Sequence, residues 1–289
     1  MTSLTSAPPA RRGPSPRVSR RLLVGAGYVT LTLAAVVIAA PVIWLFLTSL
    51  KTPLELFTLS LPAHPRFDNY GSVLGSYPIL TYLRNSVIVA ISATTAAVAL
   101  GTLAAYGFAR FPYRGSRVLF LSVLGSRMVP GIALIIPLYL ALGKLGLLDT
   151  LQGLALAHTA FALPFAIWIL EGFIRDIPRD LEEAGLIDGC SRLSVVRHIL
   201  LPVIAPGVAV TAIFSFLLSW NDFLAALIIT STPASQTMPL GLAQMTLQYG
   251  VRWDQLSAAG MMYIVPTLAM ALVLQRFIVR GLTLGAVKG

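Results

Sequence analysis

The sequence predicts an all-α, polytopic membrane protein with six membrane-spanning helices. Its 289 residues are 56% hydrophobic and 11% charged, and the mean hydropathy is +0.82. Soluble domains carry about 25% charged residues, so this composition argues against an ordinary soluble enzyme. The net charge of +10 could indicate a nucleic-acid partner or a membrane surface. The basic residues lie between long apolar runs, which favours the membrane, and no nucleic-acid partner is expected.

Six stretches approach or exceed the roughly 20 apolar residues that a helix needs to cross a bilayer. They are 22–50, 86–109, 118–142, 154–173, 203–229 and 258–279. The first is long enough to tilt, the third is interrupted by Arg127, and the fourth is the shortest. Residues 1–20 are rich in Pro, Ser and Arg, and we expect them to be disordered. Residues 19–23 resemble a twin-arginine export signal, but five further spans follow, so we expect no cleavage.

The distribution of Lys and Arg predicts the orientation. If the N-terminus is cytoplasmic, the inner segments carry a threefold excess of these residues over the outer segments. The excess recurs at every crossing, so both termini are expected in the cytoplasm. The chain then divides into a basic cytoplasmic tail (1–20), a first helix with an outer loop (21–81), a transmembrane core (82–280) and a second cytoplasmic tail (281–289).

One cytoplasmic segment, 174–202, differs chemically from the other loops. We expect it to form two short helices joined at Gly189. Asp176 is expected to cap the first, Ser191 to cap the second, and Pro202 to end the second. An apolar stripe, clustered acids and flanking arginines suit a helix that binds in a groove of another protein. A surface-lying amphipathic linker is the alternative. The acids, which lie near the positive end of the first helix, are Asp180, Glu182 and Glu183.

The spacing within this segment resembles a family signature. Glu183-Ala184-Gly185, three residues, Gly189, nine residues and Ile199-x-Leu201-Pro202 is similar to the cytoplasmic loop of permease subunits of binding-protein-dependent ABC importers. Gly185 and Cys190 stand where alanines are common, and Gly185 lowers helix propensity by about 1 kcal/mol relative to Ala. The resemblance implies the type I ABC importer permease fold.

The resemblance also implies what this loop does. Its helix would sit in a cleft on a separate ATPase subunit, where Glu183 would offer a carboxylate to a basic residue and Gly189 would allow the turn. Closure of the ATPases around ATP would then move the helix as a lever and switch the spans between inward-facing and outward-facing states. The residues implied in this coupling loop are Glu182, Glu183, Ala184, Gly185, Asp188, Gly189, Leu201 and Pro202.

Further patches resemble carbohydrate permeases of the maltose type. The resemblance implies a sugar or oligosaccharide as solute, and a C-terminal tail that reaches the ATPase pair through Gly285, Lys288 and Gly289. A frayed terminus is the alternative for the tail. The patches that carry this resemblance are 68–70, Trp220-Asn221-Asp222-Phe223, 238–242 and 275–289.

The expected partners follow from the same resemblance. They are ABC ATPase subunits, a second and different permease subunit, and an extracellular solute-binding protein, in a bacterial plasma membrane; a homodimer remains open. The chain has no Gly-x-x-x-x-Gly-Lys-Ser/Thr segment. We therefore expect no enzyme and no cofactor bound by this chain, with ATP hydrolysed by the partner subunits. One cysteine, Cys190, and three scattered histidines predict no metal site.

The substrate path has weaker signals. Arg127 lies about ten residues into its span, near mid-membrane at about 1.5 Å per residue. An ionisable group there either lines the pathway or forms a buried pair with Asp222 or a carbonyl. His158, alone on an apolar span, is expected to be a packing residue. Sugars are held by aromatic, amide and carboxyl groups, so the remaining candidates are Tyr139, Trp220 and Asn221.

Three other functions compete with this interpretation. A stand-alone secondary carrier would show intramembrane carboxylates and inverted repeats, and neither is evident. A membrane enzyme would need a His, Asp or Glu constellation within the spans, and none is evident. An ABC permease for another solute, such as a polyamine or a phosphonate, is compatible with the loop, and only the tail and the Trp220 patch argue against it.

Overall fold

The computed structural model describes residues 16–246 and 251–286, and the regular elements in these ranges are all helical. The all-α prediction is therefore confirmed for this part of the chain. Three helices, Val24–Ser49, Ile79–Arg110 and Leu151–Arg175, are long and apolar enough to cross a membrane. Two bent helix pairs raise the number of candidate spans to five among the described residues. The predicted number of six is not confirmed.

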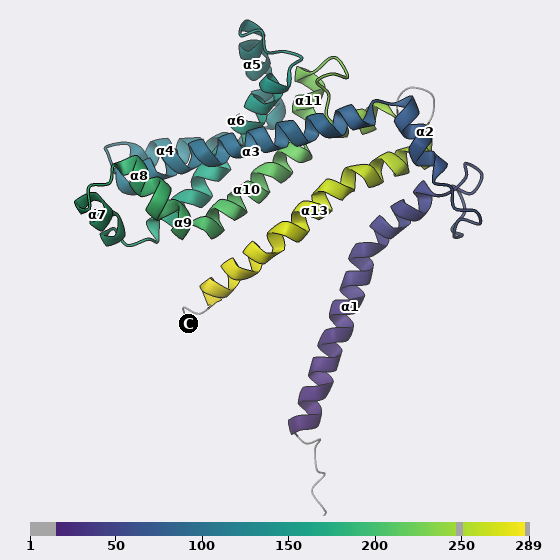
Figure 1. The fold of residues 1–289 in the computed structure, drawn as a ribbon, viewed down its shortest axis with the longest axis horizontal. Coiled ribbons are helices and arrows are strands. Elements are labelled where there is room, and N and C mark those ends of the chain that lie inside the picture. Colours follow the sequence, from purple (N-terminus) through teal and green to yellow (C-terminus); the bar gives the residue numbers. More distant parts are fainter. Residues whose placement is uncertain (1–15, 247–250, 287–289) are drawn as a thin grey trace, which may run out of the picture.

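Helices α3 (Ile79–Arg110) and α6 (Leu151–Arg175) pack against each other through small residues in the centre of the protein. Ala97, Ala162 and Ala166 are buried at this interface. A Cβ added to Gly101 would lie 2.9 Å from the Cβ of Ala166, which is closer than real contacts allow. Small residues of this kind let the backbones of two membrane helices approach closely. Helix α10 (Ala205–Trp220) packs against both α3 and α6 (Figure 1).

The third predicted span, 118–142, is sharply bent. Helix α4 (Ser116–Gly125) continues into the short helix η1 (Ser126–Met128), and α5 (Gly131–Lys144) then leaves at 104°. The residue before a proline is disfavoured in helical conformation, and Val129, which precedes Pro130, is extended with φ −75° and ψ 130°. The break therefore follows from Pro130 and separates Arg127 from the helix that follows.

The fifth predicted span, 203–229, is also interrupted. Helix α10 bends by 85° from the preceding segment Arg192–Val203 and ends at Trp220. A separate helix, α11 (Leu224–Ile229), begins after Asp222, whose Oδ1 accepts a 2.8 Å hydrogen bond from the N–H of Ala225. This carboxylate satisfies a free donor at the helix start, so the chain gains a new helix instead of extending the old one.

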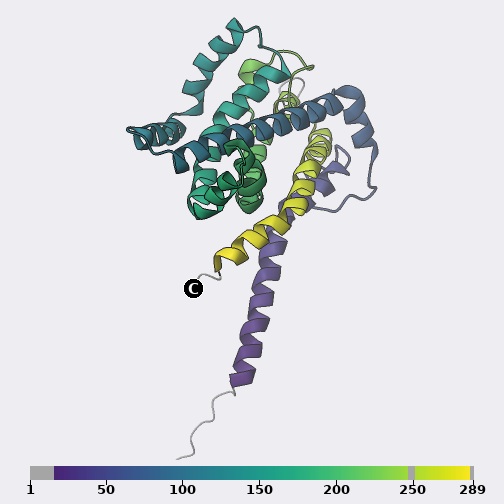
Figure 2. The ribbon, with the colours of Figure 1, turned by 60° about the vertical axis from the view of Figure 1, so that its left-hand side comes forward.

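Both chain ends differ from the predictions. Helix α1 (Pro16–Ser49) already includes residues 16–20, which we expected to be disordered. Helix α13 (Trp253–Ala286) runs past residue 281, where we expected a tail to begin, so Gly285 lies in a helix. Lys288 and Gly289 lie outside the described residues. Helix α1 extends away from the rest of the protein in both ribbon views (Figure 1 and Figure 2), and side chains along residues 24–41 are exposed.

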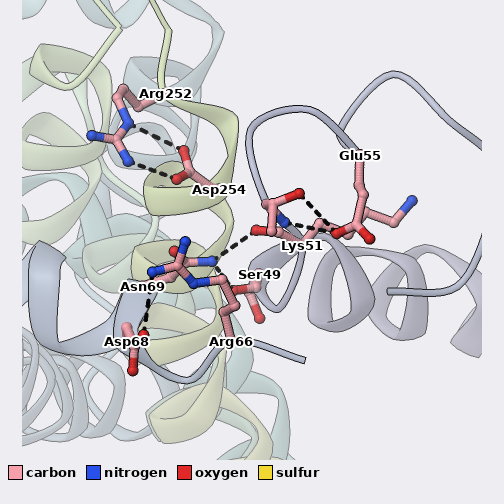
Figure 3. A network of polar contacts seen from close by, with 9 residues as sticks. Ser49, Lys51, Glu55, Arg66, Asp68, Asn69, Arg252 and Asp254 are labelled. Carbon is pink, nitrogen blue, oxygen red and sulfur yellow. Dashed lines mark hydrogen bonds and ion pairs between the residues drawn. The ribbon is translucent and has the colours of Figure 1, made fainter. Parts of the chain in front are cut away.

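The outer end of α1 is joined to helix α2 (Asp68–Ser76) by polar contacts (Figure 3). The amide of Asn69 donates to the carbonyls of Ser49 and Lys51 at 2.8 and 3.0 Å. The ammonium of Lys51 is fully buried and donates to the carbonyl of Thr58 at 2.7 Å. Each of these buried polar groups has a partner, as such groups need when they leave water.

A second outer loop, 230–237, is held from two sides. The buried amide of Asn85 on α3 donates to the carbonyls of Ala234 and Gln236, both at 2.9 Å. From the other side, Asp149 accepts hydrogen bonds from the N–H groups of Ser231 and Thr232 at 2.8 and 3.0 Å. Asp149 itself has a φ of +55°, which a non-glycine residue rarely adopts.

Acid is expected to release this loop. Partial burial raises the pKa of Asp149, but the hydrogen bonds from Ser235, Ser231 and Thr232 outweigh it and hold the pKa well below its usual range. A depressed pKa stabilises the folded loop above the unfolded value of about 4, and this stabilisation is lost progressively as the pH falls from there through the lower folded value. Limited proteolysis of this loop at pH 7 and at a series of pH values from about 4 downward measures this. Asp149→Gly, which tolerates the positive φ but has no carboxylate, should be cleaved at pH 7 as well. Equal protection of this variant and the parent at pH 7 would contradict the account.

Candidate functional site

The predicted coupling loop forms a compact unit with two short helical parts. Helix α7 (Asp180–Ile187) begins three residues later than predicted, because Asp176 ends α6 instead of capping α7. The acids of its first turn are Asp180, Glu182 and Glu183, which is where the helix dipole favours negative charge. Gly189 follows the helix with a φ of +85°, a conformation that glycine adopts without strain.

The second part of the loop is a helical segment that runs from Arg192 to Val203. Ser191 caps α8 (Arg192–Val195) as expected, accepting a 3.3 Å hydrogen bond from the N–H of Ser194. A π-helical turn, η2 (Val196–Leu200), then leads into α9 (Leu201–Val203), which contains Pro202. The helical segment ends at Val203, one residue after Pro202, so the prediction that it stops near Pro202 before the next span agrees with the structure to within one residue. Proline lacks an N–H, and the wider turn before it accommodates that missing donor.

Apolar side chains fix this unit to the neighbouring ends of α3 and α6. Val195, Val196 and Leu200 of the loop form one buried cluster with residues of α3 and α6. The α3 and α6 members are Ala105, Tyr106, Leu170 and Ile174, joined by Ile177 just after α6. The two halves of the loop also meet, since a Cβ on Gly185 would lie 2.4 Å from Cδ1 of Ile199. This explains glycine at a position where the family signature has alanine.

The contact between Gly185 and Ile199 predicts coupled mutations. Gly185→Ala is expected to destabilise the protein by about 1–3 kcal/mol through overpacking. The Ile199→Val background lacks the Cδ1 atom, so there the same change should cost about 1 kcal/mol less. Thermal unfolding of the purified protein in detergent, in a double-mutant cycle, measures the difference. Gly172→Ala is the control because a Cβ there meets nothing within 4 Å. Equal costs in both backgrounds would refute the contact.

An ion pair ties α7 to the end of α3. The guanidinium Nε of Arg110 lies 2.5 Å from Oε1 of Glu182, and both side chains are less than a tenth exposed. The Nη2 atom of Arg110 also donates to the carbonyl of Ile177 at 2.9 Å. Glu182 therefore points inward, whereas sequence reasoning grouped it with Glu183. No local pattern signals this pair, because its partners are 72 residues apart.

The opposite face of α7 is exposed, and we call it the coupling face. It consists of Leu181, Glu183, Leu186 and Ile187 on the helix, together with Asp188 directly after it. Ile187 is 85% exposed, although it is large and apolar. Ala184 is exposed beside this face, while Gly185 is buried beneath it. Apolar anchors around a free carboxylate fit a helix that binds in a groove of a partner protein.

A second group of candidates meets at a pocket of about 160 Å³, which we call the membrane pocket. It lies where η1, α5, α6, α10 and α11 approach one another. Arg127 and Asp222, two predicted path residues, both line it, but Arg127 donates to the carbonyl of Phe161 at 3.0 Å and not to Asp222. The lining includes Arg127, Ile135, His158, Phe161, Ser219 and Asp222.

His158 is more than the packing residue we expected. It is 3% exposed, and its Nδ1 lies 2.6 Å from the hydroxyl oxygen of Ser219. Its Nε2 lies 3.3 Å from Oδ1 of Asp222 without the geometry of a hydrogen bond. The sequence showed this histidine only as an isolated polar residue, because its partners come from a distant helix.

The other predicted path residues do not line the membrane pocket. Trp220 is buried and stacks on Tyr263 with a 5.3 Å centroid separation. The hydroxyl of Tyr263 donates to Oδ1 of Asn221 at 3.0 Å, which ties Asn221 to α13. Tyr139 lies on α5 and is 38% exposed. Arg127 and Asp222 are therefore the two candidates that the pocket brings together.

Comparison with known proteins is consistent with this arrangement. Residues 97–283 match the family described as "Binding-protein-dependent transport system inner membrane component". The trehalose transport system permease protein SugB of Mycobacterium tuberculosis is 38% identical over 86% of this chain and 92% of its own length. The trehalose/maltose transport system permease protein MalG of Thermococcus litoralis is 35% identical over 94% of this chain and 98% of its own.

A solved structure supports the fold. A chain in the crystal structure of a bacterial ABC transporter involved in the import of the acidic polysaccharide alginate matches with a TM-score of 0.73. The match covers 92% of this chain and 99% of that chain at 21% identity. At this identity the likeness concerns the fold alone.

Proposed function

This chain belongs to the family of binding-protein-dependent transport system inner membrane components, and we propose that it imports a sugar or oligosaccharide as the permease subunit of an ATP-driven importer. The family consists of transporter permeases and not of enzymes. The relatives named for trehalose, maltose and diacetylchitobiose transport support a carbohydrate as solute. An ABC permease for a non-sugar solute is the alternative.

The coupling face is the observation that carries the mechanism. It presents an exposed carboxylate and exposed apolar side chains on a helix that is tied to α3 by the Arg110–Glu182 pair and packs through Gly185 against the second half of the loop. An ATPase subunit that binds this face would move α7 when it closes around ATP. Since α7 is joined to α3 by a buried ion pair, the motion would reach the membrane helices directly. ATP is hydrolysed by the partner and no cofactor is bound by this chain.

The remaining partners follow from the exposed surfaces. Residues 24–41 of α1 are apolar and exposed along their length, which fits a surface covered by lipid and by a second permease subunit. We propose that this second subunit is a different chain. The solute-binding protein would bind the outer side, where the loop 230–237 is held in one conformation. Both termini would be cytoplasmic, in the plasma membrane of a bacterium.

Purification of the tagged chain from native membranes in mild detergent tests the proposal. Mass spectrometry should identify an ABC ATPase and a second permease in the same complex, and a solute-binding protein after cross-linking. Uptake of labelled trehalose, maltose and diacetylchitobiose by cells with and without the chain would then identify the solute. A chain that is recovered alone, and is active alone in vesicles, would instead be a secondary carrier.

A further inference from the structure

The membrane pocket lies at the two points where membrane helices are interrupted. Arg127 precedes the 104° bend between η1 and α5, and Asp222 occupies the gap between α10 and α11. Irregular backbone at membrane depth is tolerated where it is buried or lines a cavity. In transporters, discontinuous helices of this kind commonly form the binding site of the solute. Two independent interruptions at one pocket therefore point to a ligand.

The pocket holds polar groups whose bonding capacity is not used within the protein. Nε2 of His158 is buried and has no hydrogen-bond partner among the described residues. The side chain of Asp222 is a quarter exposed and uses Oδ1 for the N–H of Ala225. In the described part of the chain, Arg127 donates one hydrogen bond, from Nη1 to the carbonyl of Phe161, and its other N–H groups can donate to a ligand. Polar groups are expensive inside a membrane, so their presence here favours a functional role.

The walls between these polar groups are apolar. Ile135 of α5, Leu224 of α11 and Phe161 of α6 line the pocket together with the guanidinium and the carboxylate. Such a surface matches a sugar ring, which has apolar C–H faces and a rim of hydroxyl groups that both donate and accept. The volume of about 160 Å³ lies below the roughly 300–1,000 Å³ of pockets that enclose a whole ligand. It suits one ring of a larger solute.

Resting on the proposed function, we infer that the membrane pocket binds one sugar ring of the solute during translocation. Asp222 accepts a hydrogen bond from a ring hydroxyl, and Arg127 donates to another. At the buried end of the pocket, Nε2 of His158 donates a hydrogen bond to the sugar or accepts one from it, and Ser219 orients the ring. The apolar wall around Phe161 contacts the C–H face of the ring. The second permease subunit would close the open side of the pocket.

Two conservative variants test this inference in the intact transport complex. Asp222→Asn keeps an oxygen that can cap α11 but loses the charge, and Arg127→Gln loses the guanidinium. Asp68→Asn is the matched control, because it removes a carboxylate from an exposed outer ion pair far from the pocket lining. The readout is the amount of labelled trehalose or maltose retained by complexes trapped with ATP and vanadate, alongside the ATPase rate without sugar.

The expected result is that Asp222→Asn and Arg127→Gln retain about tenfold less sugar, the loss that follows from removing a hydrogen bond to a charged group. Their sugar-free ATPase rate and the control should match the parent. Unchanged retention, or a parallel fall of retention and ATPase rate, would show that the cluster is only structural. If the parent complex retains neither sugar, the proposed carbohydrate function fails first.

A thiol-protection experiment locates the sugar independently. Cys190→Ser removes the single native thiol. In that background Leu224→Cys places a thiol in the pocket, and Leu227→Cys places one on the same helix at an exposed position outside its lining. Saturating trehalose or maltose should slow the reaction of a methanethiosulfonate reagent at position 224 about tenfold and leave position 227 unaffected. Equal rates at position 224 with and without sugar would overturn the inference.

Discussion

Glu183→Lys is expected to reduce ATP-driven uptake to background while the protein remains inserted and abundant. Glu183 is exposed on the coupling face, and within the described residues it forms no ion pair, so its replacement removes only a favourable helix-dipole interaction of about 0.3–1 kcal/mol and leaves the fold intact. A lysine there would meet the basic residue that the carboxylate is proposed to bind. Juxtaposed like charges cost several kcal/mol, enough to prevent binding of the ATPase. Uptake into membrane vesicles, normalised to the amount of inserted protein, measures the effect.

Asp176→Lys is the control for this prediction. It makes the same charge reversal in the same cytoplasmic segment, but at the C-terminal end of α6, where a cation is favourable. It should transport at the parental rate. Normal uptake by Glu183→Lys would contradict the coupling assignment, and equal loss in both variants would show that the segment responds only to net charge.

Arg110→Gln is expected to have the second-largest effect, on stability and on transport together. Removing one member of a buried ion pair leaves the other charge unpaired and costs about 3–5 kcal/mol. Glu182 would be that unpaired charge, and the carbonyl of Ile177 would lose its donor. Because the pair also joins α7 to α3, uptake should fall in the molecules that remain folded. Thermal unfolding in detergent and uptake per inserted molecule measure the two effects.

Arg66→Gln provides the comparison. Arg66 pairs with Asp68 at 3.3 Å, but the two side chains are 48% and 75% exposed. Exposed pairs of this kind contribute about 0–1 kcal/mol, so this variant should unfold and transport like the parent. Arg110→Lys should not restore the parental behaviour, since a lysine cannot bind both Glu182 and the carbonyl of Ile177 with a planar fork. If Arg110→Gln is as stable as the parent, the ion pair between Arg110 and Glu182 does not stabilise the contact of α7 with α3.

Features set by neighbouring residues could be predicted from the sequence. The apolar runs predict α3 and α6, and Ser191 and Gly189 mark the start and the end of short helices because capping depends on residues a few positions apart. The break before α5 has a local cause as well, since Pro130 excludes a helical Val129. We nevertheless predicted a single span over 118–142, because apolar composition dominated the pattern.

Features that depend on distant segments could not be predicted. Arg110 and Glu182 lie on different elements, and nothing near either residue indicates their contact. His158 has the pattern of a packing residue until α10 brings Ser219 to its ring. The reason for glycine at position 185 is a side chain from the other half of the loop, Ile199. Each of these contacts depends on the packing of helices, which periodicity alone does not reveal.

Sugar uptake by the purified complex in proteoliposomes tests the central claim most directly. The chain is co-reconstituted with the ATPase and permease subunits that purify with it, and the solute-binding protein is added outside. The account predicts uptake of labelled sugar that requires ATP on the side of the membrane where the coupling face lies and the binding protein on the opposite side. The Glu183→Lys variant should lose this uptake. Uptake by the chain alone, driven by an ion gradient without ATP, would contradict it.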